Sequence, residues 1–105
     1  MFEHNKLVRD RIPEIIEANG LRSTTRILDD DEYAVLLNAK LTEELSEFLT
    51  SGEIEELADL VEIVQAIAVS RGLSWSEFEA LRFAKSETKG GFEGRMFLEA
   101  VEPLG

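Results

Sequence analysis

We expect an all-α protein, because three segments of the sequence carry helical signals. Residues 30–51 place apolar side chains at helical spacing, and residues 54–71 are apolar on most sides, as in a helix that is packed all round. Residues 75–89 begin with a Ser-Trp-Ser-Glu capping box. Two other segments, residues 21–28 and 92–103, are compatible with a minor two-stranded element.

The ends of the helices follow from capping and stop residues. Pro13 suits the first turn of a short helix near the N-terminus. The acidic run Asp29–Glu32 supplies an N-cap and first-turn carboxylates for the long second helix. Glycines mark the helix ends at Gly20, Gly52, Gly72 and Gly90-Gly91. Because only a short turn at Ser51-Gly52 separates helices two and three, we expect them to form an antiparallel helical hairpin.

The composition indicates one soluble domain. A chain of 105 residues is long enough for a single domain, and a hydrophobic content of 44% is enough to form a core. The absence of cysteine excludes disulfides and thiolate metal sites, and it fits a reducing compartment. The N-terminus has no apolar signal sequence, and the most apolar run, residues 57–69, is too short to span a bilayer. We therefore expect a cytoplasmic protein without a membrane partner.

The net charge of −11 is unevenly distributed along the chain. Residues 29–72 carry twelve acidic and two basic side chains, whereas residues 1–28 and 73–105 are close to balanced. Such a negative field repels a nucleic-acid backbone, so a nucleic-acid partner is disfavoured. A bound metal ion would reverse this effect locally and would allow a small phosphate ligand to bind.

Paired carboxylates flank the turn between helices two and three. Glu44 and Glu47 precede it, and Glu56 and Asp59 follow it. In an antiparallel hairpin Glu47 lies level with Glu56, and Glu44 lies level with Asp59, beside apolar neighbours. Four converging carboxylates would repel one another, and a divalent cation such as Mg²⁺, or Mn²⁺ in its place, would relieve this repulsion. The alternative is a solvated acidic face, since isolated acidic pairs are common on helices.

Basic residues lie at both ends of the chain and are candidates for binding phosphate. They are Lys6, Arg9 and Arg11 before the first helix, and Lys85, Lys89 and Arg95 around a Gly-Gly pair. Arginine offers a planar fork that matches phosphate oxygens, and lysine offers a point charge. The alternative for any one of them is an ion pair with a surface carboxylate.

The acidic pairs and the two ends of the chain together resemble a known superfamily. The pattern E44-L-S-E47 followed by E56-L-A-D59, with Glu43 completing an EExxE form, is similar to the metal motif of the MazG-like all-α NTP pyrophosphohydrolases. Residues 5–16 and 85–99 resemble the phosphoribosyl-ATP pyrophosphohydrolase-like subgroup. Only eight residues separate Glu47 from Glu56, a shorter connection than is usual in that superfamily.

This resemblance implies that residues 1–105 form a single MazG-like domain with a hydrolytic function. The implied reaction is Mg²⁺-dependent cleavage of a nucleoside triphosphate between the α- and β-phosphates, giving a monophosphate and pyrophosphate. Glu44, Glu47, Glu56 and Asp59 would hold the metal, and Glu47 would also take the proton of the attacking water. The substrate stays open among dUTP, aberrant triphosphates and phosphoribosyl-ATP, with a house-cleaning role favoured over histidine synthesis.

Oligomerisation is expected, because so short a chain cannot cover a helix that is apolar all round. We expect a homodimer or higher homo-oligomer in which helices of different chains complete a four-helix bundle. Two other functions remain open. One is a catalytically silent helical module that binds nucleotide or metal as a sensor, which the shortened connection favours. The other is an interaction protein whose acidic hairpin binds a basic partner.

Overall fold

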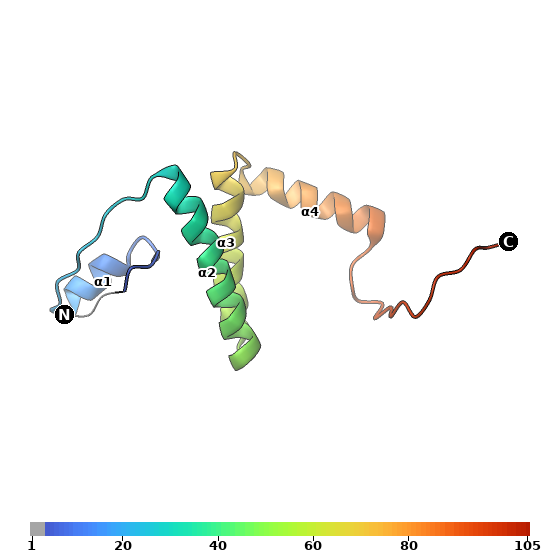
Figure 1. Ribbon diagram of the computed structural model, residues 1–105, viewed down its shortest axis with the longest axis horizontal. Coiled ribbons are helices and arrows are strands. Elements are labelled where there is room, and N and C mark those ends of the chain that lie inside the picture. Colours follow the sequence, from blue (N-terminus) through green and yellow to red (C-terminus); the bar gives the residue numbers. More distant parts are fainter. Residues whose placement is uncertain (1–3) are drawn as a thin grey trace.

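The computed structural model describes residues 4–105, which form four helices and no strand (Figure 1). The helices are α1 (Ile12–Ala18), α2 (Asp30–Ser51), α3 (Ile54–Ser70) and α4 (Trp75–Lys89). The predicted all-α class is confirmed, and α3 ends one residue earlier than predicted.

The prediction of a minor two-stranded element was wrong, because the described residues 4–105 contain no strand. Residues 21–28 connect α1 to α2, and residues 92–103 lie at the opposite end of the molecule (Figure 1). A strand is stable only when a neighbouring strand accepts and donates its backbone hydrogen bonds. Since neither segment lies beside the other, their strand-like composition does not produce a sheet.

Local capping interactions explain where α2 and α4 begin. The Asp29 carboxylate accepts a hydrogen bond of 2.8 Å from the backbone N–H of Glu32, and the Glu32 side chain accepts one from the Asp29 N–H. Ser74 and Glu77 make the same reciprocal pair of hydrogen bonds at the start of α4. At the end of α2, Gly52 adopts a φ of 70°, a left-handed conformation that glycine accepts without strain.

Helices α2 and α3 lie side by side and form the centre of the molecule, while α4 contacts α3 and then projects away (Figure 1). The described chain is elongated, with extents of 70 × 32 × 21 Å and a radius of gyration of 19.0 Å. A compact domain of this length has a radius of gyration of about 13 Å. The buried core is correspondingly small: among the described residues only Leu37, Ile63 and Ala68 are buried apolar side chains.

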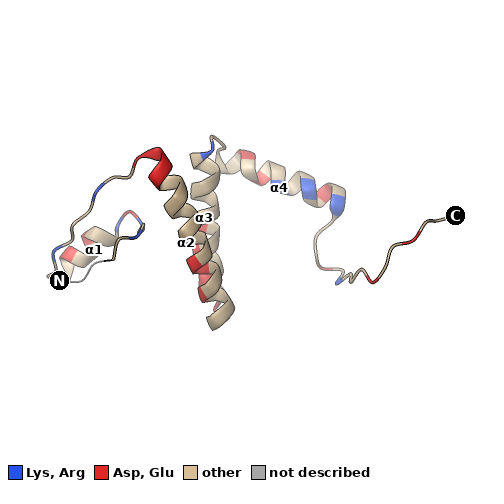
Figure 2. Ribbon diagram, viewed as in Figure 1, with Lys and Arg blue, Asp and Glu red and all other residues tan. Residues whose placement is uncertain are grey.

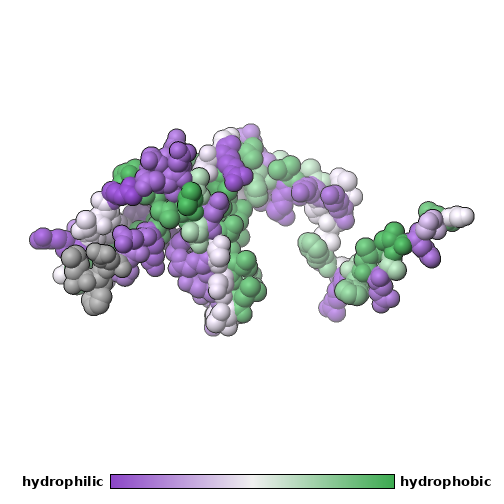
Figure 3. All heavy atoms as spheres, in the orientation of Figure 1, coloured by the Kyte–Doolittle hydropathy of each residue, from purple (hydrophilic) through white to green (hydrophobic). Residues whose placement is uncertain are grey.

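Large apolar side chains are exposed along much of the described chain, and they are concentrated in two places. One is the surface of α2 and α3 near their connecting turn, and the other is the C-terminal segment (Figure 3). Leu49 and Ile54 are 73% and 71% exposed in the first place, and Phe92 is 97% exposed in the second. A single copy of the chain therefore leaves much apolar surface in contact with water.

No helix within residues 4–105 is both long enough and apolar enough to cross a membrane.

Candidate metal centre

The acidic side chains of α2 and α3 meet in a cluster that consists of two overlapping triads. Glu43, Glu44 and Glu47 form one triad on α2, and Glu44 joins Glu56 and Asp59 of α3 in the other. Within each triad, one carboxylate oxygen of every residue lies within 4.8 Å of the others. We refer to these five residues as the acidic cluster. It contains all four carboxylates that were predicted from the sequence as metal ligands, together with Glu43.

Glu44 is at the centre of the cluster and belongs to both triads. Its side chain is buried, with a residue exposure of 7%, and its Oε2 atom has no hydrogen-bond partner. Its Oε1 atom lies 3.5 Å from Lys40 Nζ. Burial raises the pKa of Glu44, and the negative charge of the nearby Glu47 raises it further. A buried carboxylate oxygen without a partner is costly in free energy, and a cation bound at this oxygen would offset that cost.

The donor set fits a hard divalent cation. Carboxylate oxygens are the ligands that Mg²⁺ prefers, and here they come from two helices that hold them close together. The unpartnered Oε2 of Glu44 supplies a ligand atom whose desolvation has already occurred on folding. Glu56 and Asp59 are half-buried, whereas Glu47 is exposed, so the cluster is open to solvent on the Glu47 side.

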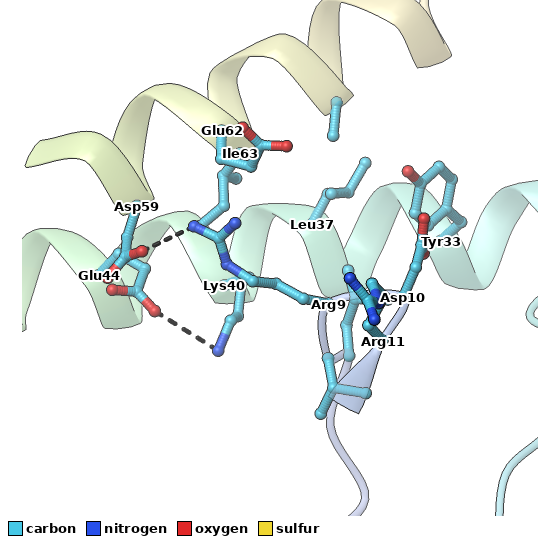
Figure 4. Close-up of a pocket in the computed structure, with 13 residues that line it drawn as sticks. Arg9, Asp10, Arg11, Tyr33, Leu37, Lys40, Glu44, Asp59, Glu62 and Ile63 are labelled. Carbon is cyan, nitrogen blue, oxygen red and sulfur yellow. Dashed lines mark hydrogen bonds and ion pairs between the residues drawn. The ribbon is translucent and has the colours of Figure 1, made fainter. Parts of the chain in front are cut away.

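Three basic side chains neutralise part of the acidic cluster. Arg9 Nη2 lies 2.7 Å from Asp59 Oδ1, and Lys6 Nζ lies 3.9 Å from Glu43 Oε1. Lys40 Nζ, on α2 itself, is 3.5 Å from both Glu43 Oε2 and Glu44 Oε1. Figure 4 shows the Arg9 and Lys40 interactions on neighbouring parts of the cluster. Two of the predicted phosphate-binding residues, Lys6 and Arg9, thus lie against the candidate metal ligands.

A pocket of about 400 Å³ adjoins the cluster, between residues 7–11 and the α2–α3 pair (Figure 4). Apolar side chains, among them Leu37 and Ile63, form part of its lining. Arg9 and Arg11 line it from the N-terminal segment, and Glu44 and Asp59 belong to the lining as well. The pocket therefore combines an apolar surface with cations and the proposed metal ligands, which is a common composition for a small-molecule site.

Sequence reasoning missed several residues of this site. Lys40 was not singled out, although it lies four residues before Glu44 and hence on the same helical face. Glu62 lines the pocket from α3, three residues after Asp59, so it could have been found by the same spacing. Tyr33 also lines the pocket, but it is one of the apolar side chains at helical spacing in residues 30–51, a pattern that does not distinguish a site residue from a packing residue. Glu43 was not counted among the metal ligands, although it pairs with Lys6 and Lys40 beside them.

The remaining predicted phosphate-binding residues are not brought to the cluster in a single chain. Arg11 lines the pocket, but its guanidinium pairs with Glu14 at 3.4 Å. Lys85 and Lys89 lie near the end of α4, and Arg95 lies beyond it, on the part of the chain that extends away from α2 (Figure 2). None of the three lines the pocket beside the cluster.

Comparisons with known proteins add a short match and no family. No protein-family model and no solved structure matches this chain. A protein of Mycolicibacterium smegmatis, described as uncharacterized, is 57% identical over 42 residues. That match covers 40% of this chain and 43% of the relative, so the chain spans less than half the length of the curated relative that it matches.

Proposed function

We propose that this protein is a Mg²⁺-dependent nucleotide pyrophosphohydrolase of the MazG-like superfamily, in its phosphoribosyl-ATP pyrophosphohydrolase-like subgroup. It cleaves a nucleoside triphosphate, or a related nucleotide, between the α- and β-phosphates and releases pyrophosphate. The observation that carries the proposal is the buried, unpartnered Oε2 of Glu44 inside a carboxylate triad drawn from two helices. The adjoining pocket supports it, because arginine side chains and apolar surface lie beside the same carboxylates.

The residues of the cluster divide into two roles. Glu44, Glu56 and Asp59, which meet across the two helices, hold Mg²⁺, with Glu47 completing the set on its exposed side. The bound ion supplies charge stabilisation for phosphate oxygens and a lowered pKa for water. Because Glu47 lies outside the cross-helix triad and is exposed, it is the carboxylate of the set that the metal occupies least, and its second oxygen takes the proton of an attacking water. With these roles, water attacks the phosphate directly, and hydrolysis proceeds without a covalent intermediate on the protein.

The pocket positions the nucleotide. Its apolar lining, which includes Leu37 and Ile63, receives the nucleoside, and the phosphate chain extends toward Arg9 and Lys6 beside the acidic cluster. The guanidinium of Arg9 matches two phosphate oxygens at once, which favours the extended charge of the transition state. A house-cleaning role on aberrant triphosphates is the favoured biological context.

The proposal is tested by pyrophosphate release from a panel of nucleoside triphosphates and phosphoribosyl-ATP, assayed with Mg²⁺ and again with EDTA. We expect at least one substrate to give pyrophosphate, rather than phosphate, with Mg²⁺ and none to do so with EDTA. Mn²⁺ is expected to replace Mg²⁺, because it accepts the same oxygen ligands. No release from any substrate would reject the enzymatic function.

A catalytically silent nucleotide or metal sensor is the second candidate. It is favoured by the connection between α2 and α3, in which only Gly52 and Glu53 separate the helices, and by the ion pair that already occupies Asp59. This alternative predicts that Mg²⁺ and nucleotide raise the melting temperature without any release of pyrophosphate. The two candidates are thus separated by combining the release assay with a thermal unfolding measurement.

We further propose that two or more copies of the chain associate, with the α2–α3 antiparallel hairpins pairing into a four-helix bundle. The exposed apolar face of α2 and α3 and the large radius of gyration support this association. Lys85, Lys89 and Arg95, which do not reach the cluster of their own chain, would then be available to the cluster of another copy.

Introducing a charge into the apolar face is expected to weaken the association. Leu49→Glu places a carboxylate at a position that is 73% exposed in the single chain, and we expect the dimer dissociation constant to rise about tenfold or more. Thr50→Glu adds the same charge one residue later, about 100° around the helix, and serves as the matched control. Light scattering with dilution measures both. An unmodified protein that is monomeric at all concentrations would contradict the proposal.

A further inference from the structure

We propose that Arg9 is an exchangeable cation of the acidic cluster. In the metal-free chain it neutralises Asp59, and it is released, together with residues 6–11, when a divalent cation binds. The inference rests on the metal site of the proposed function. It adds that Arg9 and the metal compete for the Asp59 carboxylate. It also identifies the N-terminal segment as the part of the chain that moves when the metal binds.

The contact between Arg9 and Asp59 is the starting observation. At 2.7 Å it is a direct, charge-assisted hydrogen bond between residues that are fifty positions apart in the sequence. The same Asp59 carboxylate has an oxygen within 4.8 Å of oxygens of Glu44 and Glu56, at the centre of the candidate metal site. A guanidinium and a divalent cation at neighbouring oxygens of one carboxylate repel each other. Binding of the metal therefore weakens the hold of Asp59 on Arg9.

The three cations at the cluster differ in their freedom to leave. Lys40 is part of α2, and its side chain is only 18% exposed, so its backbone is fixed beside the cluster and its side chain has little room to leave. Arg9 and Lys6 belong to the segment before α1, which has no regular secondary structure, and their side chains are 54% and 48% exposed. Their ion pairs with Asp59 and Glu43 are of the exposed kind that contributes little to stability. Arg9 is thus the cation that exchanges at low cost.

The released Arg9 remains close to the ligand pocket. Arg9 and Arg11 line the same cavity of about 400 Å³ as Glu44 and Asp59, so a small movement of the segment transfers the guanidinium from the carboxylate to the cavity (Figure 4). An anionic phosphate in that cavity would accept two hydrogen bonds from it. Metal binding therefore frees a phosphate ligand, and the two binding events favour each other.

The test measures Mg²⁺ binding by isothermal titration calorimetry in the absence of nucleotide. Arg9→Gln removes the competing cation, and we expect Mg²⁺ affinity to rise about two- to fivefold, as the loss of an exposed ion pair implies. Arg11→Gln is the matched control, because it removes the same charge from the same pocket but from a guanidinium that pairs with Glu14. We expect a clearly smaller change for this control.

Hydrogen exchange of the unmodified protein gives a second readout. Mg²⁺ is expected to accelerate exchange at the backbone amide of Ile12, which donates a hydrogen bond of 3.0 Å to the Arg9 carbonyl oxygen, while exchange in α2 and α3 is unchanged or slower. Unchanged or weaker Mg²⁺ affinity in Arg9→Gln would overturn the proposal, since Arg9 would then orient Asp59 for the metal. Absence of Mg²⁺ binding in both proteins would overturn it together with the metal site. Binding of Mg²⁺ without turnover of any nucleotide would reject only the enzymatic function.

Discussion

Replacing Glu47 with glutamine is expected to lower pyrophosphate release by about a hundred- to ten-thousand-fold, the usual contribution of a general base. Glutamine keeps the size of the side chain but cannot take a proton from water. Because Glu47 is exposed and lies outside the triad that joins α2 to α3, we expect Mg²⁺ binding to decrease much less than turnover. The measurement is a steady-state rate with saturating Mg²⁺, together with a calorimetric titration of the metal.

Two other substitutions provide the comparison and the control for Glu47→Gln. Asp59→Asn removes a carboxylate of the cross-helix triad, so we expect it to weaken Mg²⁺ binding and turnover together. Glu55→Gln makes the same exchange as Glu47→Gln at an exposed residue of α3 outside both triads, and it should change neither quantity. If Glu47→Gln loses Mg²⁺ binding as fully as Asp59→Asn does, Glu47 acts first as a metal ligand. Full activity in Glu47→Gln would exclude it as the base.

The helices were predictable because their signals are local. The reciprocal caps at Asp29 and Ser74 and the left-handed glycine at Gly52 each involve residues within four positions of one another. Apolar spacing gave the helical segments for the same reason. The proximity of Glu44 to Asp59 was also predictable, because a short turn between two helices fixes which residues lie level with each other. The same register set Glu47 level with Glu56, whereas Glu56 shares its triad with Glu44 and Asp59.

The rest of the site depends on contacts that local patterns do not encode. The pairing of Arg9 with Asp59 spans fifty residues and requires the segment before α1 to lie along the α2–α3 pair. Lys40 was predictable from its i, i+4 spacing to Glu44, but its role appears only once Glu44 is known to be buried. The failure of residues 21–28 to form a strand has the same origin, since strand formation depends on a distant partner.

Replacing Glu44 with methionine is expected to stabilise the metal-free protein at neutral pH by about 1–3 kcal/mol, because it removes a buried and incompletely satisfied carboxylate. Burial raises the pKa of Glu44 above its ordinary value of 4.5 in the folded state. The protonated carboxyl therefore favours folding, and this contribution is complete below pH 4.5 and is lost as the pH rises through the raised pKa. The stability advantage of Glu44→Met should consequently grow with rising pH.

The same residue should reverse its effect when metal is present. Mg²⁺ is expected to raise the melting temperature of the unmodified protein and to leave that of Glu44→Met unchanged, since this variant lacks the carboxylate that both triads share and that we propose as the central metal ligand. Glu44→Gln removes the charge without adding apolar surface, and it should show the same loss of the pH-dependent term. Chemical unfolding from pH 4 to pH 8, with Mg²⁺ or EDTA, measures these effects.

A metal-free Glu44→Met that is less stable than the unmodified protein would instead show that the ion pair with Lys40 outweighs the burial of the charge. Glu44 would then be a structural residue of α2, and the cluster would lose its strongest sign of a metal site.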